Sequence, residues 1–192
     1  MLIAALGISL GVLSAIWVGW NLTLDALWQP TDRTTVRRIL FLARVKEGET
    51  VVDLGCGDGR VVIAAARMFG AHGLGIEIDP LRVLWARAWA RLSGVNGSVR
   101  IMRADMYGAD LSHADVVVLF LSSDANYKLQ NKLLHELRPG ARIVSYYHPM
   151  WGWEPEEVGV AKSGYPIYLY RIPEKPGNEL HRRKQTVRQE DF

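Results

Sequence analysis

The stretch VVDLGCGDGR, residues 51–60, constrains the fold more than any other part of this chain. Apolar residues lead into a carboxylate, Asp53, and then into glycines at alternate positions, Gly55, Gly57 and Gly59. Glycine accepts backbone conformations that other residues avoid and lets the main chain approach a ligand closely. The pattern therefore predicts a strand, a tight turn and a helix, with a ligand bound against the turn beside Asp53.

The spacing of these glycines distinguishes between classes of ligand. The dinucleotide-binding fingerprint is G-x-G-x-x-G and seats a pyrophosphate at the helix N-terminus. This chain has G-x-G-x-G, and Arg60 occupies the position three residues after Gly57. A turn of this kind beside a carboxylate suits a cofactor with an amino-acid end and no phosphate. We therefore predict S-adenosylmethionine rather than a nicotinamide or flavin cofactor.

A second carboxylate, Glu77, completes the predicted nucleoside site. It lies near the end of the apolar segment 72–78, which follows the helix predicted after the glycine turn. In nucleotide-binding β-α-β units, an acid at the end of the second strand accepts hydrogen bonds from ribose hydroxyls. Strand, turn, helix, strand and acid all occur in register, which favours this interpretation over a β-α-β unit whose acids are merely solvated.

A third acid, Asp105, follows the next predicted strand, residues 98–102. Ligands of open α/β sheets lie at the carboxyl ends of the strands. We predict that Asp105 accepts a hydrogen bond from the adenine amino group while the apolar neighbour Met106 covers the ring; a solvated loop acid is the alternative. Cys56 lies inside the glycine turn, where a small residue is needed, and is expected to pack there rather than to act as a nucleophile.

Composition excludes several kinds of site and partner. The formal net charge of +3 is too small to indicate a nucleic-acid partner. The single cysteine excludes a disulfide framework, and neither it nor the five histidines have metal-ligand spacing. We expect neither a metal site nor a nucleic-acid interface.

Residues 1–24 contain no charged side chain, and the first charge is Asp25. At about 1.5 Å per residue, a helix of this length spans the hydrocarbon core of a bilayer, which is about 30 Å thick. Trp17, Trp20 and Trp28 cluster towards its C-terminal end, as interfacial aromatic residues do. The alternative is a buried first helix. Arginines follow the segment and no basic residue precedes it, so the positive-inside bias places the rest of the chain in the cytoplasm.

Helical and strand-like segments alternate along the rest of the chain. The predicted strands are 50–54, 72–78, 98–102, 114–121, 141–148 and 164–172, and the predicted helices begin near 31, 60, 80 and 124. This order predicts an α/β fold with a doubly wound, Rossmann-like, mostly parallel sheet and an antiparallel closing strand. We expect a transmembrane anchor at 1–27, a domain at 28–172 and a charged, disordered tail at 173–192.

The acceptor of the methyl group is expected beside the end of the fourth strand, at residues 120–126. Ser122 and Asn126 offer hydrogen-bond acceptors there without a ready nucleophile. The adjacent Asp124 is either part of the site or only the cap of the following helix. Methyltransferases of base amines carry Asn/Asp-Pro-Pro-aromatic at this place to grip a flat amine, and this chain lacks it.

Residues 145–153 end the fifth strand and are unusually aromatic. Aromatic walls can hold an aliphatic amine stem and favour its cationic head, which makes Tyr146 a candidate for orienting an amine. Strand alternation places Tyr146 and Tyr147 on opposite faces. Trp85 and Trp89, four residues apart, share one helix face. We expect them to pack, within the domain or against the membrane-proximal helix.

Together these motifs resemble class I S-adenosylmethionine-dependent methyltransferases. More narrowly, the chain resembles the small protein-lysine methyltransferases of archaea and their membrane-anchored mitochondrial relatives, which act on the adenine nucleotide translocase and the ATP synthase c-subunit. The resemblance runs over about residues 28–171, and its strongest segments are 30–31, 53–66, 75–80, 136–144 and 149–155. The glycine motifs indicate only the methyltransferase class, whereas the flanking segments indicate the lysine subfamily.

The resemblance implies methyl transfer from S-adenosylmethionine to lysine ε-amines of a protein, for which a membrane protein is one candidate. It implies cofactor contacts by Thr31, Asp53, Gly55, Cys56, Gly57, Gly59, Glu77, Ile78, Asp105 and Met106. The candidates for orienting the amine are Ser122, Asn126 and Tyr146. Two alternatives stay open: methylation of a small molecule or lipid, and a non-catalytic module that binds the nucleoside to regulate a membrane partner.

Overall fold

The computed structural model describes residues 29–174 of the chain. The predicted anchor at 1–27 and nearly all of the predicted tail at 173–192 lie outside these residues. Among the helices of residues 29–174, none has the length and apolar character needed to cross a membrane.

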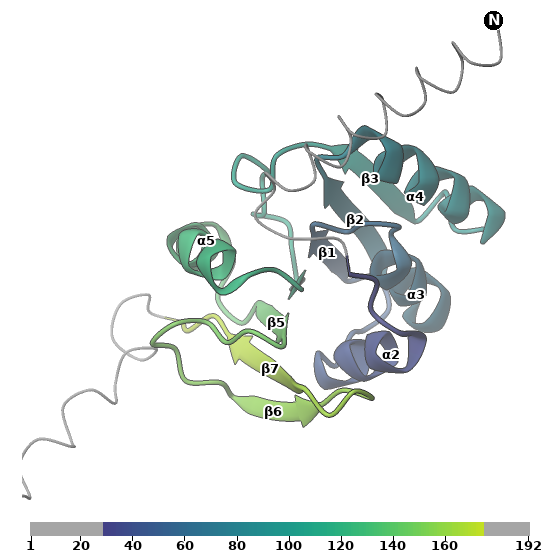
Figure 1. Cartoon of the computed structure of the whole chain (residues 1–192). Coiled ribbons are helices and arrows are strands. Elements are labelled where there is room, and N and C mark those ends of the chain that lie inside the picture. The colour runs from purple at the N-terminus through teal and green to yellow at the C-terminus, as the bar shows by residue number, and fades with distance from the viewer. Residues whose placement is uncertain (1–28, 175–192) are drawn as a thin grey trace, which may run out of the picture.

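Within the described residues, seven strands form one sheet in the order β3-β2-β1-β4-β5-β7-β6 (Figure 1). Their bounds are β1 Thr50–Leu54, β2 His72–Glu77, β3 Val99–Arg103, β4 Val116–Leu119, β5 Arg142–Tyr146, β6 Glu157–Val160 and β7 Pro166–Arg171. Strands β1 to β5 are mutually parallel, whereas β7 pairs antiparallel with both β5 and β6. The predicted mostly parallel sheet is confirmed. The strand order reverses between β1 and β4, where open α/β sheets bind their ligands.

The described helices are α2 Arg33–Leu42, α3 Arg60–Phe69, α4 Pro80–Leu92 and α5 Ser123–Glu136. Helices α2, α3 and α4 cover one face of the sheet, and α5 covers the other (Figure 1). Strand β4 is therefore buried on both faces, and all of its residues are buried. This arrangement explains why β4 is a continuous apolar run in the sequence.

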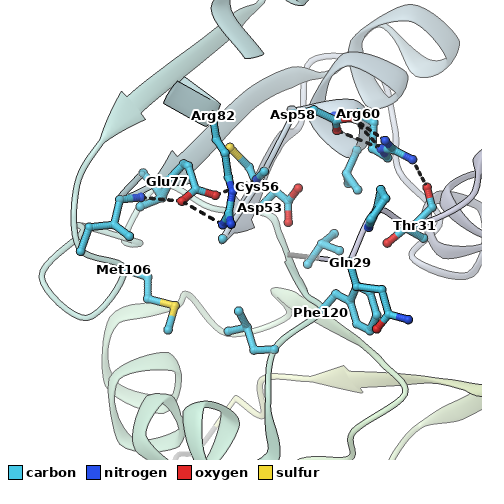
Figure 2. A pocket seen from close by; sticks show the side chains of 18 of the residues that line it. Gln29, Thr31, Asp53, Cys56, Asp58, Arg60, Glu77, Arg82, Met106 and Phe120 are labelled. Carbon is cyan, nitrogen blue, oxygen red and sulfur yellow. Dashed lines mark hydrogen bonds and ion pairs between the residues drawn. The ribbon is translucent and has the colours of Figure 1, made fainter. Parts of the chain in front are cut away.

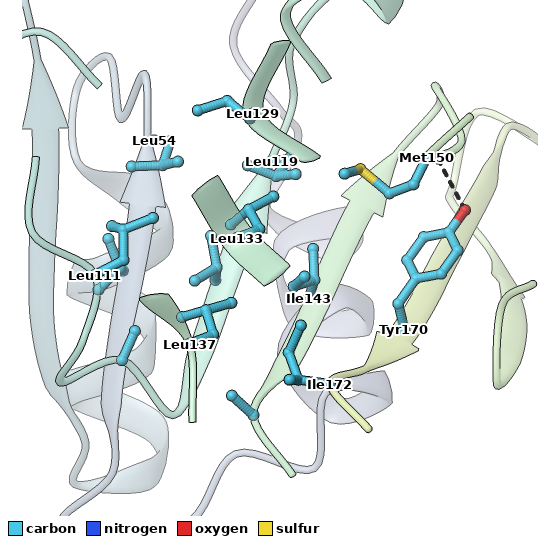
Figure 3. Close-up of a cluster of buried hydrophobic side chains, with 14 of the residues drawn as sticks. Leu54, Leu111, Leu119, Leu129, Leu133, Leu137, Ile143, Met150, Tyr170 and Ile172 are labelled. Atoms are coloured by element: carbon cyan, nitrogen blue, oxygen red, sulfur yellow. Dashed lines mark hydrogen bonds between the residues drawn. The ribbon is translucent and has the colours of Figure 1, made fainter. Parts of the chain in front are cut away.

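Successive side chains of β1 point to opposite faces of the sheet. Val51 belongs to the cluster that packs under α2 with Leu40, whereas Leu54 packs under α5 with Leu129. Figure 3 shows the α5 side of the sheet, where Leu54 and Leu119 of neighbouring strands share a cluster with Leu129 and Leu133 of α5. Each fully buried leucine stabilises the fold by about 1.5–3 kcal/mol. This double-sided core fixes β1 and β2, whose ends form the site described below.

Two helix starts also set the position of the site. The side chain of Asp32 accepts hydrogen bonds from the backbone N–H groups of Thr34 and Thr35 over 3.0 and 3.1 Å, and so caps α2. Asp79 caps α4 in the same way, and Pro80 stands at the first helical position, which suits its fixed φ angle. The first described helix, expected to begin near residue 31, therefore begins after its cap Asp32.

The structure differs from the predicted elements in three places. Strand β4 covers only 116–119 of the predicted 114–121, because the chain turns where the N–H of Ala114 donates to Leu111. Strand β5 ends at Tyr146 because Tyr147 has a φ of 72°, which breaks the extended conformation. Strand β6 was not predicted: it lies at the sheet edge with mostly exposed residues and shows no apolar alternation.

Candidate active site

A cavity of about 280 Å³ lies where β1, β2 and β4 end. Figure 2 shows Asp53 in its middle, with Glu77 and Met106 towards one end and Gln29 and Phe120 towards the other. The walls come from the glycine turn after β1, the end of β2, the loop after β3 and the residues that follow β4. The cavity is thus in the crevice predicted from the sequence.

The glycine turn brings main chain to the cavity wall. Gly55 and Gly57 have φ angles of 74° and 55°, which residues with a Cβ rarely adopt. The N–H groups of Gly55 and Cys56 both donate to the carbonyl of Ile76, over 2.9 and 3.0 Å. A Cβ on Gly55 would lie 3.1 Å from the Leu121 side chain, on the cavity wall. The turn is therefore tied to β2, and a side chain at Gly55 would crowd Leu121.

Glu77 joins the glycine turn to the start of α4. Its carboxylate accepts hydrogen bonds from the N–H groups of Gly57, Ile78 and Asp79, each over 2.9 Å. The Arg82 guanidinium lies 4.0 Å away, and both side chains are largely buried. A carboxylate has about four acceptor sites, so about one is left for a ribose hydroxyl. Glu77 thus shapes the cavity besides offering the predicted ribose contact.

Asp53 is a second buried carboxylate in the cavity. Burial, and after it the negative charges of Glu77 and Asp58, raises the pKa of Asp53 well above its usual value. No hydrogen bond or ion pair joins its carboxylate to another group of residues 29–174, although the residue is only 6% exposed. A ligand with a positive group would compensate this charge. S-adenosylmethionine, which carries an ammonium and a sulfonium, fits that requirement.

Two residues of the glycine motif, Cys56 and Gly59, have structural roles. Cys56 is buried, and a Cβ on Gly75 would lie 2.6 Å from its sulfur, so the thiol packs directly over β2. Burial above all raises the pKa of the Cys56 thiol, which keeps it protonated, in line with the predicted packing role. Gly59 does not line the cavity; it starts α3 with a φ of 77°.

Arg60 fixes the part of the cavity wall that comes from residues 29–31. The Arg60 guanidinium forms an ion pair with Asp58 and donates to the backbone carbonyl of Thr31. Thr31 lines the cavity as a result, as does Gln29 two residues before it (Figure 2). Thr31 was predicted at the site, whereas the role of Arg60 was not.

The loop after β3 closes the opposite end of the cavity. Asp105 and Met106 line it, together with Ile78 from the end of β2. Asp105 is exposed and accepts a hydrogen bond from the N–H of Tyr107 over 3.0 Å. All the predicted cofactor residues except Gly59 therefore line one cavity.

The model of the ANTKMT methyltransferase domain family matches residues 53–157, more than half of the chain. The chain belongs to this methyltransferase family. A protein-lysine N-methyltransferase from Saccharolobus islandicus is 40% identical over 76% of this chain and 92% of its own length.

Two animal relatives are similar over a shorter part of their length. The Xenopus laevis lysine N-methyltransferase of the ATP synthase c-subunit is 34% identical over 67% of this chain and 56% of its own length. The adenine nucleotide translocase lysine N-methyltransferase of Mus musculus is 37% identical over 71% of this chain and 59% of its own length. The chain thus spans little more than half of these two relatives.

A solved structure is similar over its whole length. It is described as an RNA methyltransferase from Salinibacter ruber in complex with S-adenosyl-L-homocysteine. It is 43% identical, covers 79% of this chain and 99% of its own, and has a TM-score of 0.76. Family and fold agree with the chemistry of the cavity: this methyltransferase uses S-adenosylmethionine as its methyl donor.

The three residues predicted to orient the acceptor do not line the cavity. Ser122 caps α5 by accepting from the N–H of Ala125 over 3.2 Å. Asn126 is fully buried; its amide nitrogen donates to Ser145 Oγ and to the carbonyl of His148, both over 3.0 Å. Its Oδ1 has no hydrogen-bond partner among residues 29–174. Ser122 and Asn126 therefore hold the loops after β4 and β5.

Tyr146 contacts the cavity through another ring. Its ring centroid lies 4.5 Å from that of Phe120, which does line the cavity. Its hydroxyl is 2.9 Å from Ser163 Oγ, so it is already engaged. Phe120 was not predicted as a site residue. Its position directly after the apolar run of β4, at the carboxyl edge of the sheet, was a signal that could have identified it. Arg82 was missed because nothing in the sequence shows which residues of α4 face Glu77.

Proposed function

We propose that this methyltransferase transfers a methyl group to the ε-amine of lysine residues in a protein. The observation that carries the proposal is the 40% identity to a protein-lysine N-methyltransferase over 92% of that relative's length. The two animal relatives, named for lysine methylation of the ATP synthase c-subunit and of the adenine nucleotide translocase, support the same acceptor chemistry.

The charges of the cavity suggest how the donor would be oriented. The adenosine part would lie between Glu77 and Met106, and the amino-acid part beside Asp53. The methyl group would then face the end of the cavity where Phe120 and Gln29 lie (Figure 2). The reaction is an in-line displacement at the methyl carbon: a bond forms to the amine nitrogen while the bond to sulfur breaks, and the amine then loses a proton. Alignment of these atoms supplies much of the rate acceleration.

Apolar side chains form part of the cavity wall, which suits a neutral amine. Val118, Leu121 and Ile39 line the cavity with Phe120, and the Phe120 ring, at the proposed acceptor end, packs on Tyr146. Lysine has a pKa of about 10.4 in water, and removal from water lowers it towards the reactive neutral form. We propose that Ser122, Asn126 and Tyr146 act here as positioning residues, because they hold the loops and the ring that form this end.

An exposed aromatic group lies on the same edge of the sheet, after β5. The Tyr147 ring packs edge-on against Tyr165 and against His148, with centroids 4.5 and 4.4 Å apart. Tyr147 keeps a φ of 72°, which is unfavourable for a residue with a bulky side chain. Backbone strain that the fold maintains often marks functional positions. We propose that Tyr147 guides the cationic lysine side chain towards Phe120.

We also propose that the substrate is a membrane protein and that residues 1–27 anchor the chain with its domain in the cytoplasm. The support is the sequence: residues 1–24 carry no charge and end in a tryptophan-rich stretch, and the basic residues follow. Protease digestion of sealed inside-out vesicles tests the topology. Cleavage of the domain supports the proposal, and full protection contradicts it.

Methylation of RNA is the second candidate function. It is favoured by the similarity to the structure described as an RNA methyltransferase, at 43% identity. Incubation of the purified chain with radiolabelled S-adenosylmethionine and host extract separates the candidates. Label that survives nuclease and organic solvent but not protease supports a protein acceptor. Label removed by ribonuclease, or extracted into solvent, contradicts it, and the Asp53→Asn variant provides the background.

A further inference from the structure

Helix α4 exposes a row of large apolar side chains on its outer surface, which we call the α4 stripe. Leu84, Trp85 and Leu92 are 62%, 58% and 88% exposed, and Leu81 and Trp89 complete the row. These positions follow the helical spacing i, i+3, i+4, i+8 and i+11, so the side chains form one continuous stripe. Trp85 and Trp89 were expected to pack; within the described residues they contact each other.

The inner face of α4 is already apolar and fully used. Val83, Ala86 and Ala90 are buried against Val99 and Ile101 of β3. Helix α4 is therefore apolar both on the inner face that packs against β3 and on the outer face that carries the stripe. Only the inner face is needed to pack the helix on the sheet. Exposed apolar surfaces of this kind mark sites of contact with another apolar phase or molecule. Figure 1 shows α4 at the β3 edge of the molecule, where such a contact is accessible.

The charged residues of α4 and β3 are all positive. Residues 80–104 contain no aspartate or glutamate, and their arginines are Arg82, Arg87, Arg91, Arg100 and Arg103. Arg87 and Arg91 of α4 line a groove of about 670 Å³ together with residues 96–102 and the starts of β1 and β2. A stripe of leucine and tryptophan bordered by arginine alone is complementary to a surface that is apolar inside and anionic outside.

We propose that the α4 stripe lies on an anionic lipid surface. The leucines and tryptophans would enter the boundary between headgroups and acyl chains, as the apolar faces of interfacial helices do. The arginines of α4, of which Arg87 and Arg91 are exposed, would bind lipid phosphates. This contact is separate from any membrane span, and it does not depend on the proposed lysine acceptor.

Two other occupants fit the stripe less well. The uncharged segment 1–24 could cover the apolar side chains, but it offers nothing to the arginines. RNA would pair with the arginines and stack on tryptophan, but Leu81, Leu84 and Leu92 provide no ring for a base. Of these three occupants, only an anionic lipid surface offers partners to both the apolar side chains and the arginines.

The proposed contact also orients the cavity. Leu81, the first residue of the stripe, lies between Ile78 and Arg82, and both of these line the cavity. Docking of α4 would therefore hold the cofactor site close to the lipid headgroups. A lysine near the surface of an embedded protein would then be within reach.

Site-specific nitroxide labels on the full chain test the proposal. Cysteines are introduced one at a time by Leu84→Cys, Leu92→Cys and, as a control on α5, Tyr127→Cys, which is 62% exposed in the native chain. Cys56 is buried, so the reagent reaches the introduced thiol first. The chain is reconstituted in vesicles of phosphatidylcholine with and without phosphatidylglycerol. Contact of each label with lipid-soluble oxygen and with an aqueous nickel complex is then measured.

With phosphatidylglycerol present, the labels at Leu84 and Leu92 should contact oxygen and be shielded from nickel, while the Tyr127 label stays aqueous. Replacing Arg87 and Arg91 by glutamine should weaken docking by about fivefold for each charge removed. Labels that stay aqueous in both vesicles overturn the proposal. Labels that are shielded from both oxygen and nickel without anionic lipid also overturn the proposal, because another part of a protein then covers the stripe. Release of the labelled helix from lipid on addition of single-stranded RNA overturns it as well. None of these readouts requires methyl transfer, so failure here leaves the proposed acceptor untouched.

Discussion

The backbone N–H of Gly57 donates to Oε2 of Glu77 over 2.9 Å, so the carboxylate that ends β2 holds the glycine turn that follows β1. The other oxygen of Glu77 accepts from the N–H groups of Ile78 and Asp79, where α4 begins. One side chain thus fixes two walls of the cavity. Its loss should affect the shape of the site as well as any direct contact with ribose.

Glu77→Gln should weaken both folding and cofactor binding. The amide removes the charge and turns one acceptor into a donor that faces backbone N–H groups. Hydrogen bonds to a charged group contribute about 1.5–3 kcal/mol each, so we expect a loss of at least about 2 kcal/mol in unfolding free energy. Denaturant titration measures stability, and calorimetry with S-adenosylhomocysteine measures affinity. Glu157→Gln, at the exposed edge strand β6, is the control; equal effects from both variants would refute this role.

Cofactor binding should be linked to a proton on Asp53. Burial and the charges of Glu77 and Asp58 raise the pKa of Asp53 above its ordinary value of 3.8 in the folded protein. A positive ligand favours the ionised form, so binding at a pH below the raised pKa should release up to about one proton. Calorimetry in two buffers with different ionisation enthalpies measures the release. Identical heats in both buffers, or proton release that persists in Asp53→Asn, would contradict the assignment.

The same shift predicts how stability depends on pH. A raised folded-state pKa gives a stabilising contribution that is fully present below 3.8 and is lost as the pH rises through the folded-state value. Asp53→Asn should therefore stabilise the cofactor-free protein near neutral pH and have little effect in acid. Thermal melts across this range test the sign. A variant less stable than the wild type at neutral pH would show that the buried carboxylate is compensated.

Gly59→Ala should cost stability while leaving cofactor affinity unchanged. A left-handed φ costs a non-glycine residue about 1–2 kcal/mol. The new Cβ would also lie 3.3 Å from both Ala86 and Ile101, which must shift. Gly94→Ala is the matched control, with a φ of 72° and no atom within 4 Å of the added Cβ. Gly59→Ala should be the more destabilising variant; a selective loss of S-adenosylhomocysteine binding would instead make Gly59 a cofactor residue.

Tyr147 offers a test that separates strain from function. Tyr147→Gly removes the ring and the unfavourable φ together, whereas Tyr147→Ala removes the ring and keeps the strain. We expect the glycine variant to be more stable than the alanine variant by about 1 kcal/mol. Both should methylate protein more slowly, with unchanged affinity for S-adenosylhomocysteine. Wild-type rates in both variants would remove Tyr147 from the acceptor path.

Most of the cofactor end of the site could be predicted from local sequence patterns. Asp53, Gly57 and Glu77 could be placed because a strand end, a glycine turn and a second strand end meet at one edge of a parallel sheet. The helix bounds of α3 and α4 followed from the flanking glycine and from Pro80. These features depend on residues close together in the chain.

The acceptor end depends on contacts between distant segments, and sequence patterns do not reveal those. Tyr146 was selected for its aromatic side chain, but pairing of β5 with β7 buries it, and the neighbouring Tyr147 is the exposed ring. Phe120 reaches the cavity only because β4 ends one residue before it. The role of Arg60 required knowing that Thr31 returns to the start of α3.

The most direct test of the account is to identify the methylated side chain. Protein from host membranes is incubated with the full chain and isotopically labelled S-adenosylmethionine, digested, and sequenced by tandem mass spectrometry. The account predicts labelled methyl groups on lysine Nζ, absent when Asp53→Asn replaces the wild type. Label found only on ribonucleosides, lipids or side chains other than lysine would contradict it.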